Sequence, residues 1–226
     1  MKNKKIMTTL LLILATTGCT APNSPVLPAT SQPANRSTSQ AQVATDRQQP
    51  FDYYLLNLSW SPEYCHSHRA AAECAERASF VLHGLWPQNF DGTYPQNCSS
   101  ASGPADPSRF SDLYPEPGLL RHEWRTHGTC SGLSPEAFFT AARQAFHAVA
   151  IPIELTALDH QISMPPIQLL RLFANSNPSF PKASFAISCG NNYLTAIQVC
   201  LNKALQPIAC GPIRSCRANS IRITPP

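Results

Sequence analysis

The stretch SFVLHGLWP, residues 79–87, is a short apolar run that carries one histidine and ends on a proline. This composition predicts a β-strand that stops at Pro87, because proline has no backbone N–H to donate to a neighbouring strand. An aromatic and aliphatic run at residues 51–60, FDYYLLNLSW, precedes it and ends at Ser61-Pro62. It predicts a first strand, so the folded part of the chain is expected to begin near Phe51.

The rest of the chain mixes helical and hairpin patterns without regular βαβ alternation. Residues 88–107 are rich in Gly, Pro, Ser and Asn and predict a long functional loop. Helices are predicted over residues 118–130, 134–150 and 163–175, and strands over 183–188, 193–201 and, as a final pair, within 208–222. This order predicts an α+β fold, with a central antiparallel sheet packed against several helices and stapled by disulfides.

The first residues predict export. Lys2, Lys4 and Lys5 precede a short apolar run and Gly18-Cys19, which is typical of a leader over residues 1–19 and too short for a membrane span. Residues 15–19, ATTGC, resemble a bacterial lipoprotein processing site, so a lipid anchor at Cys19 is one expectation and ordinary signal cleavage nearby is the other. Residues 20–50, rich in Pro, Ser, Thr and Gln, predict a flexible linker, which leaves residues 51–226 as the folded domain.

Charge and cysteine content narrow the class of protein. The formal net charge is +4. Three of these charges are leader lysines, so the exported part carries about +1 and charge alone does not indicate a nucleic-acid-binding protein. Besides Cys19 there are eight cysteines, an even number that predicts a disulfide framework in an exported chain. No C-x2-C pair occurs, so the sequence does not predict a structural zinc site.

Two short segments carry the residues suited to proton transfer: HGLWP at 83–87 and HEWRTHGTC at 122–130. On a helix, Glu123 and His127 share a face, which suits an acid–base pair. His122 and His127 are five residues apart, about 140° around the axis, so the spacing excludes the zinc-protease motif with histidines four apart. His83 alone is either a buried structural histidine or an acid–base group, with Gly84 allowing close backbone approach beside it.

Both segments resemble the active-site signatures of the ribonuclease T2 family, which includes bacterial periplasmic members. Residues 58–62, LSWSP, and the four-cysteine tail also resemble that family, and the likeness covers about residues 51–216. It implies an exported endoribonuclease that cleaves single-stranded RNA by metal-independent acid–base transesterification through a 2′,3′-cyclic phosphate. RNA is the expected partner of a monomer without cofactor or metal. The expected location is the periplasm, by lipid anchorage to the outer membrane or free, or else the medium.

The resemblance also implies a role for individual residues. Catalysis falls to His127 as base, His83 as acid and Glu123 as a stabiliser of the charged transition state; His122 binds the phosphate, and Trp86, assisted by Tyr94, binds a base.

Two positions depart from the family pattern. Thr126 stands where the family usually has lysine, which removes a cation beside the phosphate. Arg125 is adjacent but lies about 100° away on a helix. Gln88 replaces an acidic base-reading residue of some relatives, so base preference stays open.

Spacing alone does not choose among the possible cysteine pairings. The resemblance implies one set, with the second bond tying the long loop to the end of the catalytic helix: Cys65 with Cys74, Cys98 with Cys130, Cys189 with Cys216, and Cys200 with Cys210.

Two other functions are compatible with parts of the sequence. A non-catalytic binding or toxin-like protein could share the fold, although this chain keeps both histidines and Glu123. A metal-dependent hydrolase could use His83, His127 and Glu123 as a two-histidine, one-carboxylate site, although the family chemistry needs the same residues free of metal.

Overall fold

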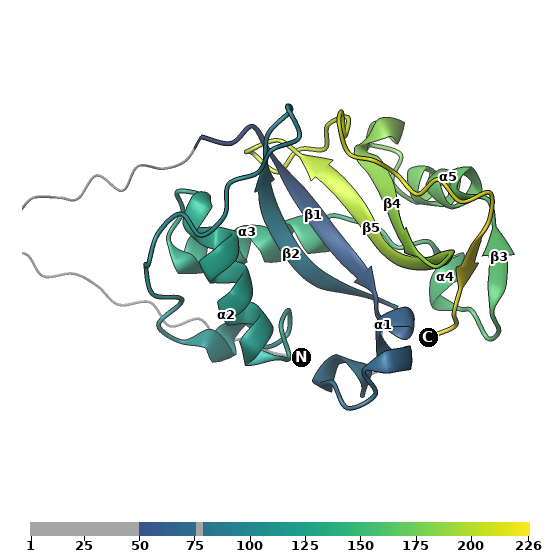
Figure 1. Cartoon of the computed structure of the whole chain (residues 1–226), viewed down its shortest axis with the longest axis horizontal. Coiled ribbons are helices and arrows are strands. Elements are labelled where there is room, and N and C mark those ends of the chain that lie inside the picture. Colours follow the sequence, from purple (N-terminus) through teal and green to yellow (C-terminus); the bar gives the residue numbers. More distant parts are fainter. Residues whose placement is uncertain (1–49, 76–78) are drawn as a thin grey trace, which may run out of the picture. The chain divides into compact units, whose positions relative to one another are not determined.

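The structure is a computed structural model that describes residues 50–75 and 79–226 (Figure 1). The expected leader, Cys19 and nearly all of the expected linker lie outside these residues. Within them, no helix is both long and apolar enough to span a bilayer.

A six-stranded sheet forms the centre of the domain, in the order β2-β1-β5-β6-β3 with β4 paired to β5. Its pairings are antiparallel except that of β5 with β6, which is parallel over the single pair Tyr193 and Arg222. The strands are β1 (Tyr53–Trp60), β2 (Phe80–Gln88), β3 (Ile162–Met164), β4 (Phe185–Gly190), β5 (Tyr193–Leu201) and β6 (Ile221–Ile223). The expected α+β fold is therefore confirmed, with a sheet that is mixed at one pairing.

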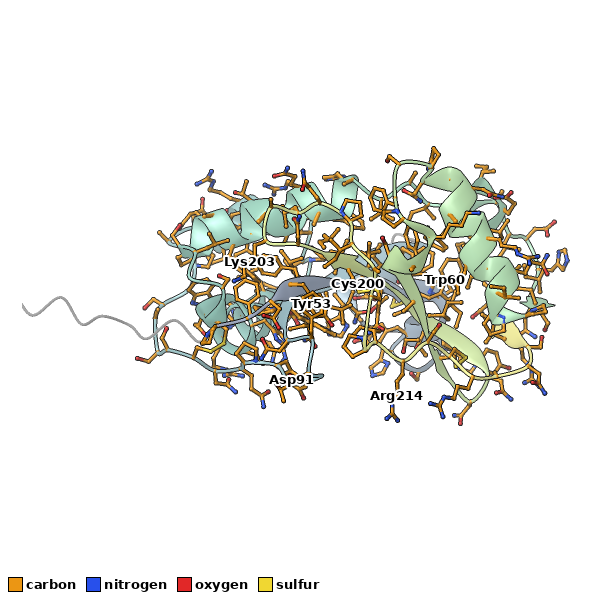
Figure 2. All side chains as sticks on the ribbon, turned by 90° about the horizontal axis from the view of Figure 1, so that it is seen from above. Tyr53, Trp60, Asp91, Cys200, Lys203 and Arg214 are labelled. Carbon is orange, nitrogen blue, oxygen red and sulfur yellow. A yellow bond between two sulfur atoms is a disulfide. The ribbon has the colours of Figure 1, made fainter. Side chains whose placement is uncertain are left out.

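Helices α3 and α5 pack against the sheet, α3 against β1 and β2 and α5 against β4 (Figure 1). Alternate residues of β1 serve the two faces of the sheet: Leu56 and Leu58 belong to the main core with the helices, whereas Tyr53 and Leu55 join a smaller cluster with Cys200 on the opposite face (Figure 2). The helices are α1 (Ser61–Ser67), α2 (Pro117–Thr126), α3 (Pro135–His147), α4 (Ile153–Thr156) and α5 (Pro166–Ser176).

Several predicted boundaries were wrong. Strand β2 runs through Pro87 to Gln88. It is an edge strand, with β1 on one side, and a proline is tolerated there because its missing N–H is not needed by a second neighbouring strand. The helix predicted from residue 163 begins at Pro166, since Ser163 belongs to β3. The final pair of strands is absent from the described residues 208–222, which contribute only β6.

Other predictions were confirmed. Ser134 caps α3 by accepting a hydrogen bond from the N–H of Ala137, with Pro135 in the first turn. The β4–β5 hairpin turns at Asn191 and Asn192, both in the left-handed backbone region. All four disulfides implied by the resemblance are present, with Cα–Cα distances between 5.0 and 5.6 Å.

Candidate active site

His83 lies at a break in the pairing of β1 with β2. Asn57 pairs with Gly84 and Leu58 pairs with Leu82, so His83 is the extra residue of a β-bulge. A bulge bends a strand and redirects a side chain, and here it leaves the His83 side chain 41% exposed on a strand that is otherwise mostly buried. Ser59 fixes the ring through a 3.1 Å hydrogen bond between its Oγ and His83 Nδ1. Nε2 is thereby left facing the site.

Glu123 lies buried beside His83, next to the half-buried Trp86. The Trp86 indole N–H donates a 2.8 Å hydrogen bond to Oε2 of Glu123, whose side chain is fully buried. The other carboxyl oxygen, Oε1, has no hydrogen-bond partner among the described residues and lies 3.8 Å from His83 Nε2. Gly84 makes this approach possible, since a Cβ at that position would lie 2.1 Å from Glu123 Oε2 and 2.3 Å from Trp86 Nε1.

Helix α2 ends at Thr126, and this brings His127 back toward the site. His127 is the C-cap, with φ −116° and ψ −46°, and its N–H donates to the Glu123 carbonyl oxygen at 3.0 Å. A tight turn follows, which requires Gly128 because a Cβ there would lie 2.3 Å from the Trp124 ring. The His127 and His122 rings are 6.3 Å apart, closer than an uninterrupted helix suggests from their spacing.

Three polar side chains contact Trp86, and Glu123 is one of them through the hydrogen bond described above. Its ring stacks on that of His127 at 5.1 Å and meets that of His83 edge-on at 5.3 Å. The structure therefore brings together His83, Trp86, Glu123, His122 and His127. One face of Trp86 is occupied by His127, and base stacking on Trp86 stays a prediction.

Burial sets the protonation of the group. Desolvation raises the pKa of Glu123 to about 8, and the Trp86 hydrogen bond opposes this rise. Desolvation, followed by the charges of His122 and His83, lowers the pKa of His127 to about 4. The pKa of His83 is also lowered, by desolvation and then by His122. Near pH 5, His127 is thus a free base while Glu123 holds a proton.

Three of these residues also have the composition of a metal site, with His122 in the place of His83, which the sequence had suggested. Donor atoms of His122, Glu123 and His127 lie within 4.8 Å of one another. Donors around a tetrahedral zinc ion are about 3.4 Å apart, so the side chains must draw closer to hold one. A metal-dependent reaction at these three donors is therefore an alternative that experiment can test.

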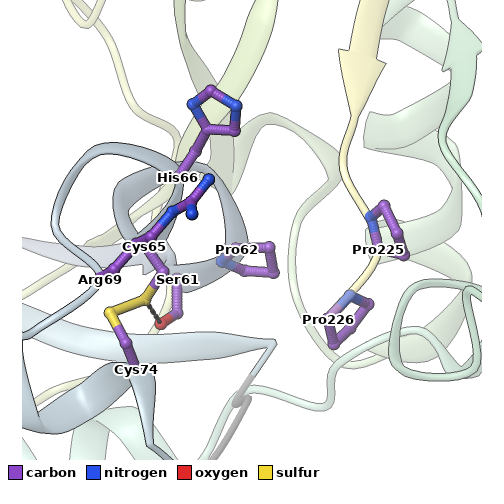
Figure 3. Close-up of a pocket in the computed structure, with 8 residues that line it drawn as sticks. All are labelled: Ser61, Pro62, Cys65, His66, Arg69, Cys74, Pro225 and Pro226. Carbon is purple, nitrogen blue, oxygen red and sulfur yellow. Dashed lines mark hydrogen bonds between the residues drawn. A yellow bond between two sulfur atoms is a disulfide. The ribbon is translucent and has the colours of Figure 1, made fainter.

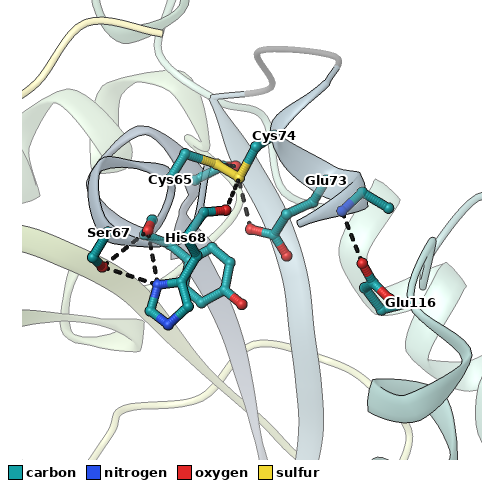
Figure 4. Close-up of a disulfide and its surroundings, with 9 residues drawn as sticks. Cys65, Ser67, His68, Glu73, Cys74 and Glu116 are labelled. Carbon is teal, nitrogen blue, oxygen red and sulfur yellow. Dashed lines mark hydrogen bonds between the residues drawn. A yellow bond between two sulfur atoms is a disulfide. The ribbon is translucent and has the colours of Figure 1, made fainter. Parts of the chain in front are cut away.

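A cavity of about 550 Å³ opens beside the site. It is lined by His83 and His122 and also by Tyr64, Glu73 and Glu116. The segment that carries Tyr64 and Glu73 is held by the Cys65–Cys74 disulfide and by Glu116, whose Oε1 accepts a 2.8 Å hydrogen bond from the Ala72 N–H (Figure 4). The volume falls in the range of ligand sites, roughly 300–1,000 Å³.

A second cavity, about 360 Å³, lies between α1 and Pro225-Pro226 (Figure 3). None of the residues proposed for proton transfer lines it. Its polar rim is supplied by His66 and Arg69, and this cavity is not part of the candidate active site.

The remaining sequence-predicted positions are distributed around the site. Thr126 is buried, with its hydroxyl 3.5 Å from His122 Nδ1, while Arg125 is exposed. Tyr94 is 52% exposed on the loop after β2, and within the described residues neither a hydrogen bond nor a ring contact joins it to Trp86. Gln88 is buried at the end of β2, paired with Tyr53. The structure leaves the base-binding role of Tyr94 and the effect of Gln88 as predictions.

Sequence reasoning missed two residues of the site. Ser59 on β1 contacts His83 on the neighbouring strand β2. Tyr114 is buried with its hydroxyl unpaired among the described residues, and burial and then Glu123 raise its pKa. Nothing in the local pattern marks either residue, because both act through neighbours distant in the chain.

Comparisons with known proteins agree on one family. Residues 51–210 match the sequence model of the ribonuclease T2 family. A ribonuclease of Aeromonas hydrophila is 47% identical over 106 residues, which are 46% of this chain and 49% of that protein. A probable ribonuclease of Haemophilus influenzae is 27% identical over 188 residues, covering 74% of this chain and 64% of that protein. The aligned part of the chain thus spans about half to two thirds of these relatives.

Solved structures share the fold. An RNase-related protein from Calystegia sepium superposes with a TM-score of 0.63 at 21% identity, covering 76% of this chain and 97% of the other. RNase NT in complex with 5′-AMP superposes with a TM-score of 0.60 at 22% identity, covering 79% of this chain and 99% of the other.

Proposed function

Because the chain belongs to the ribonuclease T2 family, we propose that it is an endoribonuclease that cleaves single-stranded RNA by metal-independent transesterification. One observation carries the proposal: His83 and His127 lie on two sides of the Trp86–Glu123 pair, each in ring contact with Trp86. Two imidazoles placed around one carboxyl group suit a reaction in which one proton is removed and another is delivered.

In the proposed reaction, His127 takes the proton from the ribose 2′-hydroxyl. The 2′-oxygen attacks the adjacent phosphorus, and the bond from phosphorus to the 5′-oxygen breaks as His83 delivers a proton to that oxygen. The products are a 2′,3′-cyclic phosphate and a 5′-hydroxyl end. Water can later open the cyclic phosphate with the two histidines in exchanged roles.

Glu123 and His122 act on the phosphate. With its pKa raised to about 8, Glu123 carries a proton in acidic solution and can donate a hydrogen bond to a phosphoryl oxygen. His122 is exposed beside it and supplies a second donor. No lysine accompanies them at position 126, and the adjacent Arg125 is exposed and lies about 100° away around the helix.

The pH–rate profile follows from the two histidines. The base must be neutral, which holds above the lowered pKa of His127 at about 4, and the acid must be protonated, which holds below the lowered pKa of His83. We expect kcat/KM for a dinucleotide to follow a bell with its optimum between about pH 4 and 6.5. The measurement is kcat/KM from pH 3 to 9, and an optimum above pH 7 would contradict these roles.

Cleavage in the presence of chelator separates this proposal from its rivals. Oxidised, purified protein is expected to degrade single-stranded RNA at an unchanged rate in EDTA and to leave DNA of the same sequence intact. Activity that EDTA removes and zinc restores would instead favour a metal-dependent hydrolase at His122, Glu123 and His127, whose donors lie within 4.8 Å. Binding without cleavage would favour a non-catalytic relative.

The surroundings of the site suit a nucleotide substrate. RNase NT, of the same fold, binds 5′-AMP, and the cavity beside His83 and His122 has room for one nucleotide here. We propose Trp86 and Tyr94 as base contacts. Four disulfides are typical of an exported protein, and we propose export as a monomer, to the periplasm or the medium, with lipidation of Cys19 as the means of anchoring.

A further inference from the structure

The charges of this chain are divided along the sequence. All thirteen acidic residues lie at or before Asp159, and residues 160–226 carry six basic residues and no acidic one. The small net charge therefore conceals a basic C-terminal part. Salt bridges among the described residues involve none of its arginines. Within residues 50–75 and 79–226, no carboxylate pairs with their guanidinium groups.

Two of these arginines line a polar cavity of about 480 Å³, which we call the Arg217–Arg222 pocket. Its other lining residues carry hydroxyl or amide groups, apart from one alanine: Ser163, Asn192, Ala218, Asn219 and Ser220. Hydroxyl and amide groups together with guanidinium groups are the usual donors to phosphate oxygens.

The pocket is built from anchored backbone. Arg222 donates its backbone N–H to the Asn192 carbonyl at 2.7 Å, and its guanidinium lies 5.2 Å over the Tyr193 ring with Nη1 donating to the Tyr193 hydroxyl. The Cys189–Cys216 disulfide fixes the residue next to Arg217 to β4. Cations held in this way lose little conformational freedom when they bind a ligand.

The pocket is separate from the proposed catalytic group. In the sheet order, β6 stands three strands from β2, roughly 14 Å at the usual spacing between strands. Arg214 projects from the same C-terminal segment into solvent (Figure 2) and extends the basic surface. A ligand that reached both places would have to be an extended polyanion.

We propose that the Arg217–Arg222 pocket is a secondary binding site for the phosphodiester backbone of single-stranded RNA. It binds a part of a long substrate that is distant from the bond being cleaved. The choice of RNA rests on the proposed function. A dinucleotide has one bridging phosphate, which must lie at the catalytic group, so only longer RNA can use the pocket. The site is therefore expected to favour long over short substrates in a salt-dependent manner.

The test combines binding with turnover. Binding of a 2′-O-methyl 20-mer, which lacks the nucleophile, is measured by fluorescence anisotropy at several salt concentrations. The double variant Arg217→Gln/Arg222→Gln is expected to bind the 20-mer about tenfold more weakly at low salt. The slope of the logarithm of its association constant against the logarithm of salt concentration should become shallower by about 1.4. The KM of this variant for a long RNA should rise similarly, with kcat/KM for a dinucleotide unchanged.

A matched variant controls for net charge. Arg171→Gln/Lys182→Gln removes two exposed charges from the same part of the chain but outside the pocket, and it should bind the 20-mer as the unchanged protein does. Equal losses in both variants, or no loss in the first, would overturn the proposal. Binding to phosphatidylglycerol vesicles is measured in the same way. The proposal would also be overturned if Arg217→Gln/Arg222→Gln lost binding to these vesicles but kept its binding to the 20-mer. If the protein without substitutions bound the 20-mer through the pocket but cleaved no dinucleotide, the proposed function would be refuted and the pocket proposal would stand.

Discussion

Replacement of His127 or His83 by alanine is expected to lower kcat for RNA cleavage by about 10²–10⁴-fold in each case, because each change removes one of the two proton-transfer groups. The effects should not add, since neither histidine completes the reaction alone. The measurement is single-turnover cleavage of a dinucleotide at pH 5. His147→Ala, at an exposed position on α3, is the control and should keep full activity.

Folding must be followed in the same variants. His127 is buried, and its Nδ1 has no hydrogen-bond partner among the described residues, so His127→Ala removes packing without leaving a new unpaired group. Thermal unfolding should stay cooperative in both variants. A folded His127→Ala protein with full activity would remove His127 from the mechanism, and the same outcome for His83→Ala would remove His83.

The second large effect is expected from Gly84→Ala. The new Cβ would lie 2.1 Å from Glu123 Oε2 and 2.3 Å from Trp86 Nε1, so the hydrogen bond between these side chains must break. A buried carboxyl group that loses its partner costs about 1–3 kcal/mol of stability. Because the same displacement separates Glu123 from both histidines, we expect activity to fall by at least about 10²-fold.

Gly103→Ala is the matched control, since a Cβ there meets the Trp124 ring at an ordinary 3.6 Å. The measurements are the thermal midpoint and kcat/KM on a dinucleotide. Gly84→Ala should lower both and Gly103→Ala neither. If Gly84→Ala kept full activity, the close contact of β2 with Glu123 would be unnecessary for function.

Local pattern predicted much of the fold. The apolar runs of β1 and β2, the Ser-Pro start of α3 and the Asn-Asn hairpin each depend on a few adjacent residues, and all were found. The cysteine pairing came from the family resemblance, because spacing alone could not select it. Strand β3 escaped prediction and β6 was anticipated only in part, because three residues are too few to show alternation. These two strands pair with each other, and β6 also pairs with β5.

The candidate site was predictable as residues but not as geometry. Spacing linked Glu123 to His127, and the resemblance added His83 and His122. The bulge at His83 depends on the register between β1 and β2, and the approach of His127 to His122 depends on the end of α2 at Thr126. Both are consequences of tertiary packing, as is the contact of Ser59 with His83.

The identity of the product ends tests the central claim most directly. An RNA oligonucleotide is incubated with the protein in EDTA at pH 5, alongside a copy with one 2′-deoxyribonucleotide at the cleaved position. The account predicts 2′,3′-cyclic phosphate and 5′-hydroxyl ends from the RNA, and no cleavage at the deoxy position. Cleavage at the deoxy position, or 5′-phosphate ends, would show that the 2′-hydroxyl is not the nucleophile and would contradict the account.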